Sequence, residues 1–366
     1  MKNLSIFLNI LVQIFLLLFI GLIIFIFVAN KAGKKQTLRV LIPTGLYVLN
    51  NQIVDDAGRN IRLIGVSKSG TEYSCVSSST AIVGPSDVAS IDAMKTWNIN
   101  VVRVPLNEDC WLGINGVVVG GINYQRTITN YINKLINNGL IVIVELHWSA
   151  PGTQKTTGQM QMADADHSIT FWTQVASAYK SNTSIIFEPY NEPYNIDWKC
   201  WRDGGTCTGV EYKVAGMQQM VNAIRETGAT NIIALGGLSS SNDLSGWLIN
   251  KPQDPQNNLV AVWHEYNFSS CKDIDCWNSQ IAPLALKVPI IVTELGENDC
   301  SHVFIDGLMN WLDRYNISYL GWAWNTWDCK TGPALISNYD GTPTAFGIGF
   351  KEHIASFSAI TTSTSQ

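Results

Sequence analysis

Two glutamates stand where short apolar runs of the chain end. Glu192 lies in the segment IIFEPYNEP, and Glu294 lies in PIIVTELGE. Two carboxyl groups that face each other across a cleft can hydrolyse a glycoside, because one protonates the leaving oxygen while the other attacks or activates water. We interpret Glu192 and Glu294 as such a pair. The gap between the two groups decides between retention and inversion at the sugar, and the sequence leaves both open.

Other polar residues stand at the same position of further apolar runs. They include Arg103 in VRVPL, His147 in VELHW, and His264 and Tyr266 in WHEYNF. A guanidinium beside a nucleophilic carboxylate keeps that carboxylate ionised. The negative charge of an ionised Glu294 would in turn help the acid of the pair to keep its proton. The shared position of these residues indicates one site that is assembled from several strands.

The chain alternates short apolar runs with longer amphipathic stretches. The amphipathic stretches include 86–97, 124–137 and 210–226, and each predicts a helix. The apolar runs are rich in Ile and Val, as strands buried on both faces are. The predicted strands are 61–66, 99–104, 140–146, 184–187, 231–235, 259–263, 289–293 and 317–322. This alternation predicts a single (β/α)8 TIM barrel, in which the reacting groups lie at the carboxyl ends of the strands.

Composition and charge exclude several kinds of function. The chain carries 24 basic and 29 acidic residues, a formal net charge of −5, and so lacks the basic excess of a nucleic-acid-binding protein. Hydrophobic residues make up 46% of the chain and charged residues 14%, which excludes intrinsic disorder for most of its length. No Gly-x-Gly-x-x-Gly motif follows the first predicted strand, which argues against the usual dinucleotide-binding site. We expect no cofactor, no metal and no nucleic-acid partner, and we expect a monomer.

The first 36 residues are predicted to form a signal anchor and its basic flank, followed by the barrel domain at 37–366. Residues 4–29 carry no charge, and about 20 such residues are enough to cross a membrane as a helix. A cleaved secretory signal has a shorter apolar core and a small-residue cleavage site. We therefore predict a transmembrane segment that is not cleaved, with secretion after cleavage as the alternative.

The cysteines and the lysines disagree about the side of the membrane on which the barrel lies. Lys31, Lys34 and Lys35 follow the apolar segment and favour a cytoplasmic location. All eight cysteines also follow it, and the spacings 200/207 and 271/276 suit local disulfides in loops. Three Asn-x-Ser/Thr triplets begin at Asn182, Asn267 and Asn316. Because a large domain can translocate despite a few charges, we predict an extracytoplasmic, membrane-anchored protein.

The segment 186–193, IFEPYNEP, resembles the signature of glycoside hydrolase family 5, the cellulase family among the retaining (β/α)8 glycosidases. One departure is Pro189, where the family usually carries an aliphatic or small residue, and a strand end tolerates its missing donor. The resemblance covers about 45–355, because further segments follow in the family's order: VRVPLNEDCW, VELHW, WHEYNF, PIIVTELGE, GWAWNTWDC and YDGTPTAFG.

The resemblance implies a role for each residue of the site. Glu294 would be the nucleophile and Glu192 the acid/base, with Asn191 holding the 2-hydroxyl of the sugar. Arg103 and Tyr266 would hydrogen-bond to Glu294 and orient it. No cofactor would be needed.

The resemblance also implies residues that bind the sugar. His147 and His264 would contact the sugar or tune Glu192. A tryptophan of the eighth strand would form the floor under the reacting sugar, and we expect Trp324 rather than Trp322, because Trp324 is nearer the carboxyl end of the strand.

The 13 tryptophans suggest the shape of the binding site. Exposed aromatic faces stack on sugar rings, and we expect three or four loop tryptophans to line an open cleft, among Trp111, Trp148, Trp198, Trp201, Trp277 and Trp327. An open cleft favours an endo-acting enzyme on polysaccharide. We predict an endo-β-1,4-glucanase, with a β-mannanase or another β-glycan hydrolase of the family as the alternative. An alternative of another class is a catalytically silent carbohydrate-binding surface protein.

Four more glutamates compete for a place in the site. Glu297 follows Glu294 by three residues and is the best rival carboxylate. We expect Glu145 to be structural and Glu188 to be a buried partner of a neighbouring base. Strand alternation predicts that Glu265 faces away from its neighbours.

Overall fold

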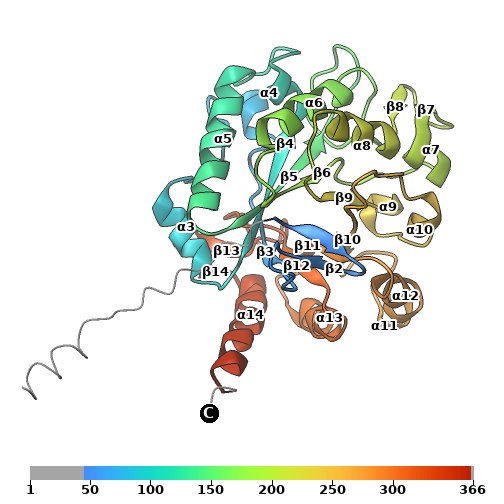
Figure 1. Cartoon of the computed structure of the whole chain (residues 1–366). Helices are drawn as coiled ribbons and strands as arrows, with labels where there is room; N and C mark the ends of the chain where they lie inside the picture. The colour runs from blue at the N-terminus through green and yellow to red at the C-terminus, as the bar shows by residue number, and fades with distance from the viewer. Residues whose placement is uncertain (1–44, 364–366) are drawn as a thin grey trace, which may run out of the picture. The chain divides into compact units, whose positions relative to one another are not determined.

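Eight parallel strands form a closed barrel in the computed structural model, which describes residues 45–363 of the 366-residue chain (Figure 1). Each strand pairs with the barrel strand that follows it in the sequence. The strands are β3 (Ile64–Ser67), β4 (Val101–Asn107), β5 (Ile141–Trp148), β6 (Ile185–Glu188), β9 (Ile233–Gly236), β10 (Leu259–Tyr266), β11 (Ile290–Gly296) and β12 (Ser318–Gly321). The predicted (β/α)8 barrel is therefore confirmed.

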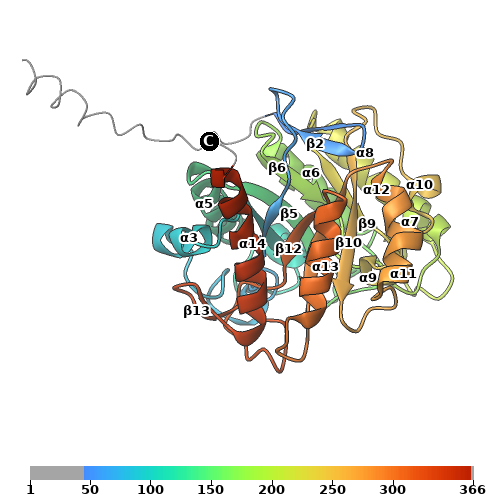
Figure 2. The ribbon, with the colours of Figure 1, turned by 90° about the horizontal axis from the view of Figure 1, so that it is seen from below.

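Helices connect the strands and surround the barrel (Figure 1). Figure 2 shows that the last two helices, α13 and α14, run side by side. The longer helices are α3 (Val88–Lys95), α5 (Ile122–Asn137), α6 (Ser168–Tyr179), α8 (Met217–Glu226), α13 (Val303–Arg314) and α14 (Ala345–Ser363). The shorter ones are α2 (Ser74–Ser77), α4 (Glu108–Leu112), α7 (Trp198–Asp203), α9 (Leu238–Ser241), α10 (Trp247–Asn250), α11 (Ile274–Cys276), the π-helix η1 (Trp277–Ile281) and α12 (Ala282–Ala285).

The helix predicted at 210–226 is shorter than expected, because α8 begins only at Met217. The residues before it form an antiparallel hairpin of β7 (Gly204–Thr206) and β8 (Lys213–Ala215). The first two residues of β7 are glycines with φ angles of 69° and 86°, a left-handed region that glycine adopts without a steric penalty. The hairpin thus takes up residues that the sequence pattern assigned to the helix.

The interior of the barrel has an apolar part and a polar part. Aliphatic side chains fill the part at the amino ends of the strands, and the hairpin of β1 (Tyr47–Leu49) and β2 (Gln52–Val54) packs against it. Successive side chains of a strand point to opposite faces. Val101 points into the barrel, so Arg103, two residues later on the same strand, points inward as well. The same alternation places polar side chains of other strands inside the barrel at its carboxyl end.

Disulfides fix several loops on the barrel. The two predicted local bridges are present, and the remaining four cysteines also pair. The bridges are Cys75–Cys110, Cys200–Cys207, Cys271–Cys276 and Cys300–Cys329. The predicted anchor at 1–36 and the boundary that follows it lie outside the described residues. Among residues 45–363, no helix is both long and apolar enough to cross a bilayer.

Candidate active site

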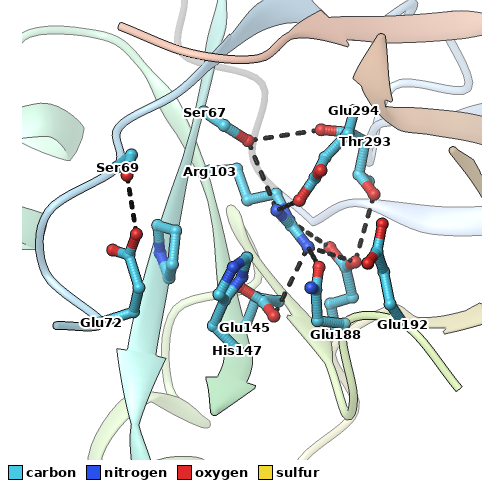
Figure 3. Close-up of polar contacts among 12 residues, drawn as sticks. Ser67, Ser69, Glu72, Arg103, Glu145, His147, Glu188, Glu192, Thr293 and Glu294 are labelled. Atoms are coloured by element: carbon cyan, nitrogen blue, oxygen red, sulfur yellow. Dashed lines mark hydrogen bonds and ion pairs between the residues drawn. The ribbon is translucent and has the colours of Figure 1, made fainter. Parts of the chain in front are cut away.

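Arg103 is the centre of the polar part of the barrel, where Figure 3 shows its contacts with Glu145, Glu188 and Glu294. Its guanidinium is fully buried and donates to Glu294 Oε1 at 2.6 Å and to both oxygens of Glu188 at 2.9 Å. It also donates to Asn191 Oδ1 at 2.7 Å and lies 3.5 Å from Glu145. One cation therefore holds two carboxylates and the side-chain amide of Asn191 in fixed positions. Glu188 is a buried partner of this base, as the sequence predicted.

Glu294 is surrounded by positive charge and hydrogen-bond donors. Burial alone would raise its pKa, but the charges of His264, Arg103 and His147 outweigh this effect and lower the pKa to about 2. The hydroxyl of Tyr266 donates to Glu294 Oε2 at 2.6 Å. Burial and the neighbouring carboxylate hold the pKa of Tyr266 well above its usual value, so it remains a donor. Glu294 is thus an ionised and oriented carboxylate, as a nucleophile must be.

Glu192 reaches into the cavity beside His264. Its side chain is 24% exposed, whereas that of Glu294 is 5% exposed. His264 Nδ1 lies 2.9 Å from Glu192 Oε1 and 3.7 Å from Glu294 Oε2. The other ring nitrogen, Nε2, lies 2.9 Å from the hydroxyl of Thr293. Burial alone would lower the pKa of His264, but the charges of Glu294 and Glu192 raise it overall.

His147 carries a positive charge on the opposite side of the site. Its Nδ1 lies 3.0 Å from Glu145 Oε2. Burial alone would lower its pKa, but Glu145 raises the pKa to about 9. The imidazole ring stacks on Trp322, with ring centres 5.4 Å apart and an angle of 1° between the planes. His147 can therefore donate a hydrogen bond into the cavity and also fix the ring of Trp322.

Five of the predicted residues line one cavity of about 510 Å³, and Arg103 and His264 are not among its lining residues. One part of its wall carries titratable, amide and aromatic side chains: His147, Asn191, Glu192, Tyr266, Glu294 and Trp322. The other part consists of residues that follow the carboxyl ends of β9, β10 and β12: Ser239, Ser240, Asn242, Phe268, Ser269, Ser270 and Pro333. Such a concave site with converging polar groups is suited to binding a small polar unit such as a sugar.

Trp324 does not line this cavity, and the prediction that it forms the floor was wrong. Its side chain is fully buried and packs edge-on against Trp97, with ring centres 5.1 Å apart. Trp322 lines the cavity instead. Strand β12 ends at Gly321, and Trp322 follows it directly. Trp324 lies further along the loop, where its backbone N–H donates to Ser67 and its ring packs in the core. Strand alternation alone would place both tryptophans on the same side of the chain, so it could not have identified the correct one.

None of the six loop tryptophans lines this cavity, so the expectation that three or four of them would line it was wrong. Trp111, Trp201 and Trp277 are buried in the core, contrary to the expectation that loop tryptophans are exposed. Two others extend the aromatic wall beside Trp322. The ring of Trp327 lies 6.4 Å from that of Trp322, and the ring of Trp148 lies 6.3 Å from that of His147.

Two further aromatic residues of the site were missed. Tyr73 lies beside Trp148, with ring centres 6.2 Å apart. Phe268 is 58% exposed and stacks on Tyr266, with ring centres 4.9 Å apart and an angle of 13° between the planes. Phe268 follows Tyr266 by two residues, a spacing that could have indicated the same side of the chain.

The rival carboxylates have other partners. Glu297 does not line the cavity, and its Oε1 accepts a hydrogen bond from the backbone of Ile305 in the first turn of α13. Glu265 is buried and bonds to Asn242, on the side away from Glu294. Both findings favour Glu192 and Glu294 as the reacting pair.

Glu192, His264 and Glu294 each place one donor atom within 4.8 Å of the others, close enough to share a small cation. The hydrogen bond between Glu192 and His264 already engages two of these atoms, and we assign no metal ligands here. A second group within residues 45–363 contains Cys300, Cys329 and Asp328, but its cysteines are joined in a disulfide.

A family model described as cellulase (glycosyl hydrolase family 5) matches residues 54–328. The endoglucanase MaCel5A of a Microbulbifer species is 22% identical over 320 residues, which cover 80% of this chain and 55% of the relative. A manganese-dependent endoglucanase, Eg5A of Phanerodontia chrysosporium, is 29% identical over 227 residues, which cover 57% of this chain and 54% of the relative. The chain thus spans little more than half the length of these relatives.

Solved structures share the fold. The cellulase Cel5C_n superposes with a TM-score of 0.66 at 18% identity, covering 88% of this chain and 95% of its own. The β-glucanase SdGluc5_26A of Saccharophagus degradans, in complex with cellotetraose, superposes with a TM-score of 0.65 at 18% identity. The match covers 85% of this chain and 93% of the β-glucanase chain. At this identity the superpositions show a common barrel.

Proposed function

Because the chain belongs to glycosyl hydrolase family 5, the cellulase family, we propose that it is a retaining endo-β-1,4-glucanase. The observation that carries the proposal is the closeness of its two reacting groups, since Glu192 and Glu294 place carboxylate oxygens within 4.8 Å of each other. Retaining glycosidases hold their carboxyl groups about 5–5.5 Å apart, whereas inverting ones leave roughly 6.5–9.5 Å for a water molecule. The gap supports a direct attack by Glu294 on the sugar.

In the first step an oxygen of Glu294 bonds to the anomeric carbon. The bond from that carbon to the glycosidic oxygen breaks, and Glu192 gives its proton to the leaving oxygen. The low pKa of Glu294 keeps it ionised, and Arg103 and Tyr266 hold its two oxygens in place. Asn191, which also lines the cavity, is placed to bind the 2-hydroxyl.

In the second step water completes the reaction. Glu192, now a carboxylate, takes a proton from a water molecule whose oxygen bonds to the anomeric carbon from the side that the leaving group vacated. The ester bond to Glu294 breaks and returns its carboxylate. Two inversions at the same carbon give net retention.

Aromatic rings on two sides of the reacting pair support action on a chain rather than on a small glycoside. His147 and Trp322 form one side, and the exposed ring of Phe268 forms another. The relatives carry endoglucanase in their names, and one neighbouring structure holds cellotetraose. A β-mannanase or another β-glycan hydrolase would use the same pair of glutamates and remains the alternative substrate assignment.

Trp322 and Trp324 should differ in what their replacement changes. Trp322→Ala removes a ring from the cavity wall and should lower kcat/KM on β-glucan by about tenfold, because stacked apolar area is lost. Trp324→Ala leaves a cavity in the core and should destabilise the fold by about 3–5 kcal/mol. Kinetics and thermal melting of both variants test this. If Trp322→Ala were as active as the wild type, Trp322 would be excluded as a sugar platform.

We propose that the protein acts outside the cytoplasm as a membrane-anchored, glycosylated monomer. Four disulfides support an oxidising compartment, and the apolar segment at 4–29 supports an anchor. Of the three glycosylation triplets, that of Asn316 begins with an exposed residue. Three measurements test these parts separately. Alkaline extraction of membranes tests the anchor, glycosidase treatment of the protein tests the glycosylation, and light scattering in detergent tests the monomeric state.

The substrate is tested with the full chain, produced under oxidising conditions in detergent. Release of reducing ends is measured on carboxymethylcellulose, mixed-linkage β-glucan, glucomannan, mannan and xylan. Activity on the glucans would support the proposal, and activity on mannan alone would replace the substrate but not the mechanism. A silent binding protein would bind glycan without hydrolysis. In an enzyme, Glu192→Gln should lose hydrolysis by about 10²–10⁴-fold and keep binding.

A further inference from the structure

Thr293, the residue before Glu294, is fully buried between two groups of the site. Its hydroxyl donates to Glu188 Oε1 at 3.1 Å, and its oxygen lies 2.9 Å from His264 Nε2. Glu188 receives two N–H groups of Arg103, so its carboxylate acts only as an acceptor. The hydroxyl proton of Thr293 is therefore committed to Glu188. The lone pairs of its oxygen are left to accept a hydrogen bond, and Nε2–H of His264 must donate it.

This chain of donors determines which nitrogen of His264 carries the proton. With a proton on Nε2, a neutral imidazole presents the lone pair of Nδ1 to Glu192 Oε1, 2.9 Å away. A hydrogen bond then requires that Glu192 carry a proton. If the imidazole is positively charged instead, Nδ1–H donates to the Glu192 carboxylate. In both arrangements a single proton lies between His264 Nδ1 and Glu192 Oε1.

We propose that Thr293 is a positioning residue that holds the proton of His264 on Nε2 and so makes Glu192 and His264 a pair sharing the catalytic proton. The inference rests on the proposed function, because it assigns the source of the proton that the leaving oxygen receives. Thr293 itself touches neither the sugar nor the reacting atoms. It acts through His264, and through Glu188 it connects that residue to the ion pair of Arg103.

The pairing also explains how Glu192 becomes a base in the second step. Once its proton has gone to the leaving oxygen, a carboxylate faces the lone pair of Nδ1, and two acceptors at this distance repel each other. A proton from water relieves that repulsion. If the proton could move from Nε2 to Nδ1, the imidazole would donate to Glu192 and make it a weaker base. Thr293 opposes that shift because only Nε2–H can satisfy its oxygen.

The carboxylates around His264 also help the pair of His264 and Glu192 to keep its shared proton. Glu294 lies 3.7 Å from Nδ1, and Glu188 Oε1 lies 3.9 Å from Nε2. Both carboxylates favour a protonated ring, whereas the charge of Arg103 opposes it. Formation of the ester removes the charge of Glu294 at the step in which the pair must give up its proton. The proton is thus held before the bond breaks and is released when the ester forms.

Thr293→Val tests the proposal, because valine keeps the shape and lacks the hydroxyl, and Thr293→Ser is the matched control. In the valine variant the alkaline limb of the kcat/KM profile should move to lower pH by about one unit, the worth of a hydrogen bond to a charged group. The serine variant should keep the wild-type limb. A purely structural role would lower activity at every pH without moving the limb, and that result would overturn the proposal.

Nitrogen-15 NMR of His264 gives a second test that needs no turnover. The proposal requires a protonated Nε2 in the neutral ring of the wild type and of Thr293→Ser, and a shift toward Nδ1–H in Thr293→Val. A wild-type ring with its proton on Nδ1 would refute the proposal even if the valine variant does not fold. A wild type that hydrolyses none of the glycans would contradict the proposed function instead, and the spectrum would still report the tautomer.

Discussion

Glu294→Gln is expected to lower kcat on β-glucan by at least about 10⁴-fold, since removing a nucleophile abolishes the covalent route. Glutamine has nearly the shape of glutamate but cannot form the ester. The loss should appear in kcat, because the rest of the cavity wall remains. Reducing-end release at saturating substrate measures it, and a melting curve shows whether the variant is folded.

Glu297→Gln is the matched control for this result. Glu297 lies three residues further along and accepts a backbone N–H in the first turn of α13, a bond that a glutamine oxygen can also accept. Its replacement should leave kcat within about twofold, as is usual for a change that touches no reacting group. If Glu297→Gln abolished activity and Glu294→Gln did not, the assignment of the nucleophile would be wrong.

Arg103→Met is expected to destabilise the fold by about 3–5 kcal/mol, because it leaves buried carboxylates without their cation. Arg103 is fully buried and forms ion pairs with Glu188 and Glu294. Denaturant unfolding near neutral pH measures the loss. Arg202→Met is the control, since the Arg202–Asp203 pair is about two-fifths exposed and should contribute little to stability.

The loss in Arg103→Met should depend on pH. The folded protein holds the pKa of Glu294 at about 2, below its ordinary value of 4.5. A depressed pKa contributes stability that is fully present above pH 4.5 and is lost as the pH falls toward 2. Part of that depression comes from Arg103, so the difference between wild type and variant should shrink below about pH 4. A difference that stays constant down to pH 2 would mean that lost packing, rather than lost charge, destabilises the variant.

The barrel and the reacting pair could be predicted because both follow from short-range patterns. Runs of Ile and Val mark strands buried on both faces, and a polar residue at the end of each run marks the functional edge. The position of these residues at the strand ends does not depend on where the helices begin and end. It is the reason why Arg103, Glu192 and Glu294 are brought together although they are distant in the sequence.

Other features depend on packing that no local pattern contains. Trp322 follows the end of β12 directly and lines the cavity, whereas Trp324 lies further along the loop and packs against Trp97 in the core. Phe268 is exposed, and its ring stacks on that of Tyr266. The role of Thr293 depends on hydrogen bonds to residues of two other strands. Such contacts become visible only when the side chains are in place.

The central claim is a covalent attack by Glu294 across a short gap, and the anomeric configuration of the first product tests it most directly. Proton NMR of a cello-oligosaccharide digest, recorded before the free sugar mutarotates, reports that configuration. The account predicts that the newly released reducing end appears first as the β-anomer and only later equilibrates. An α-anomer as the first product would mean that water attacks the sugar directly, and it would contradict the assignment of Glu294 as a nucleophile.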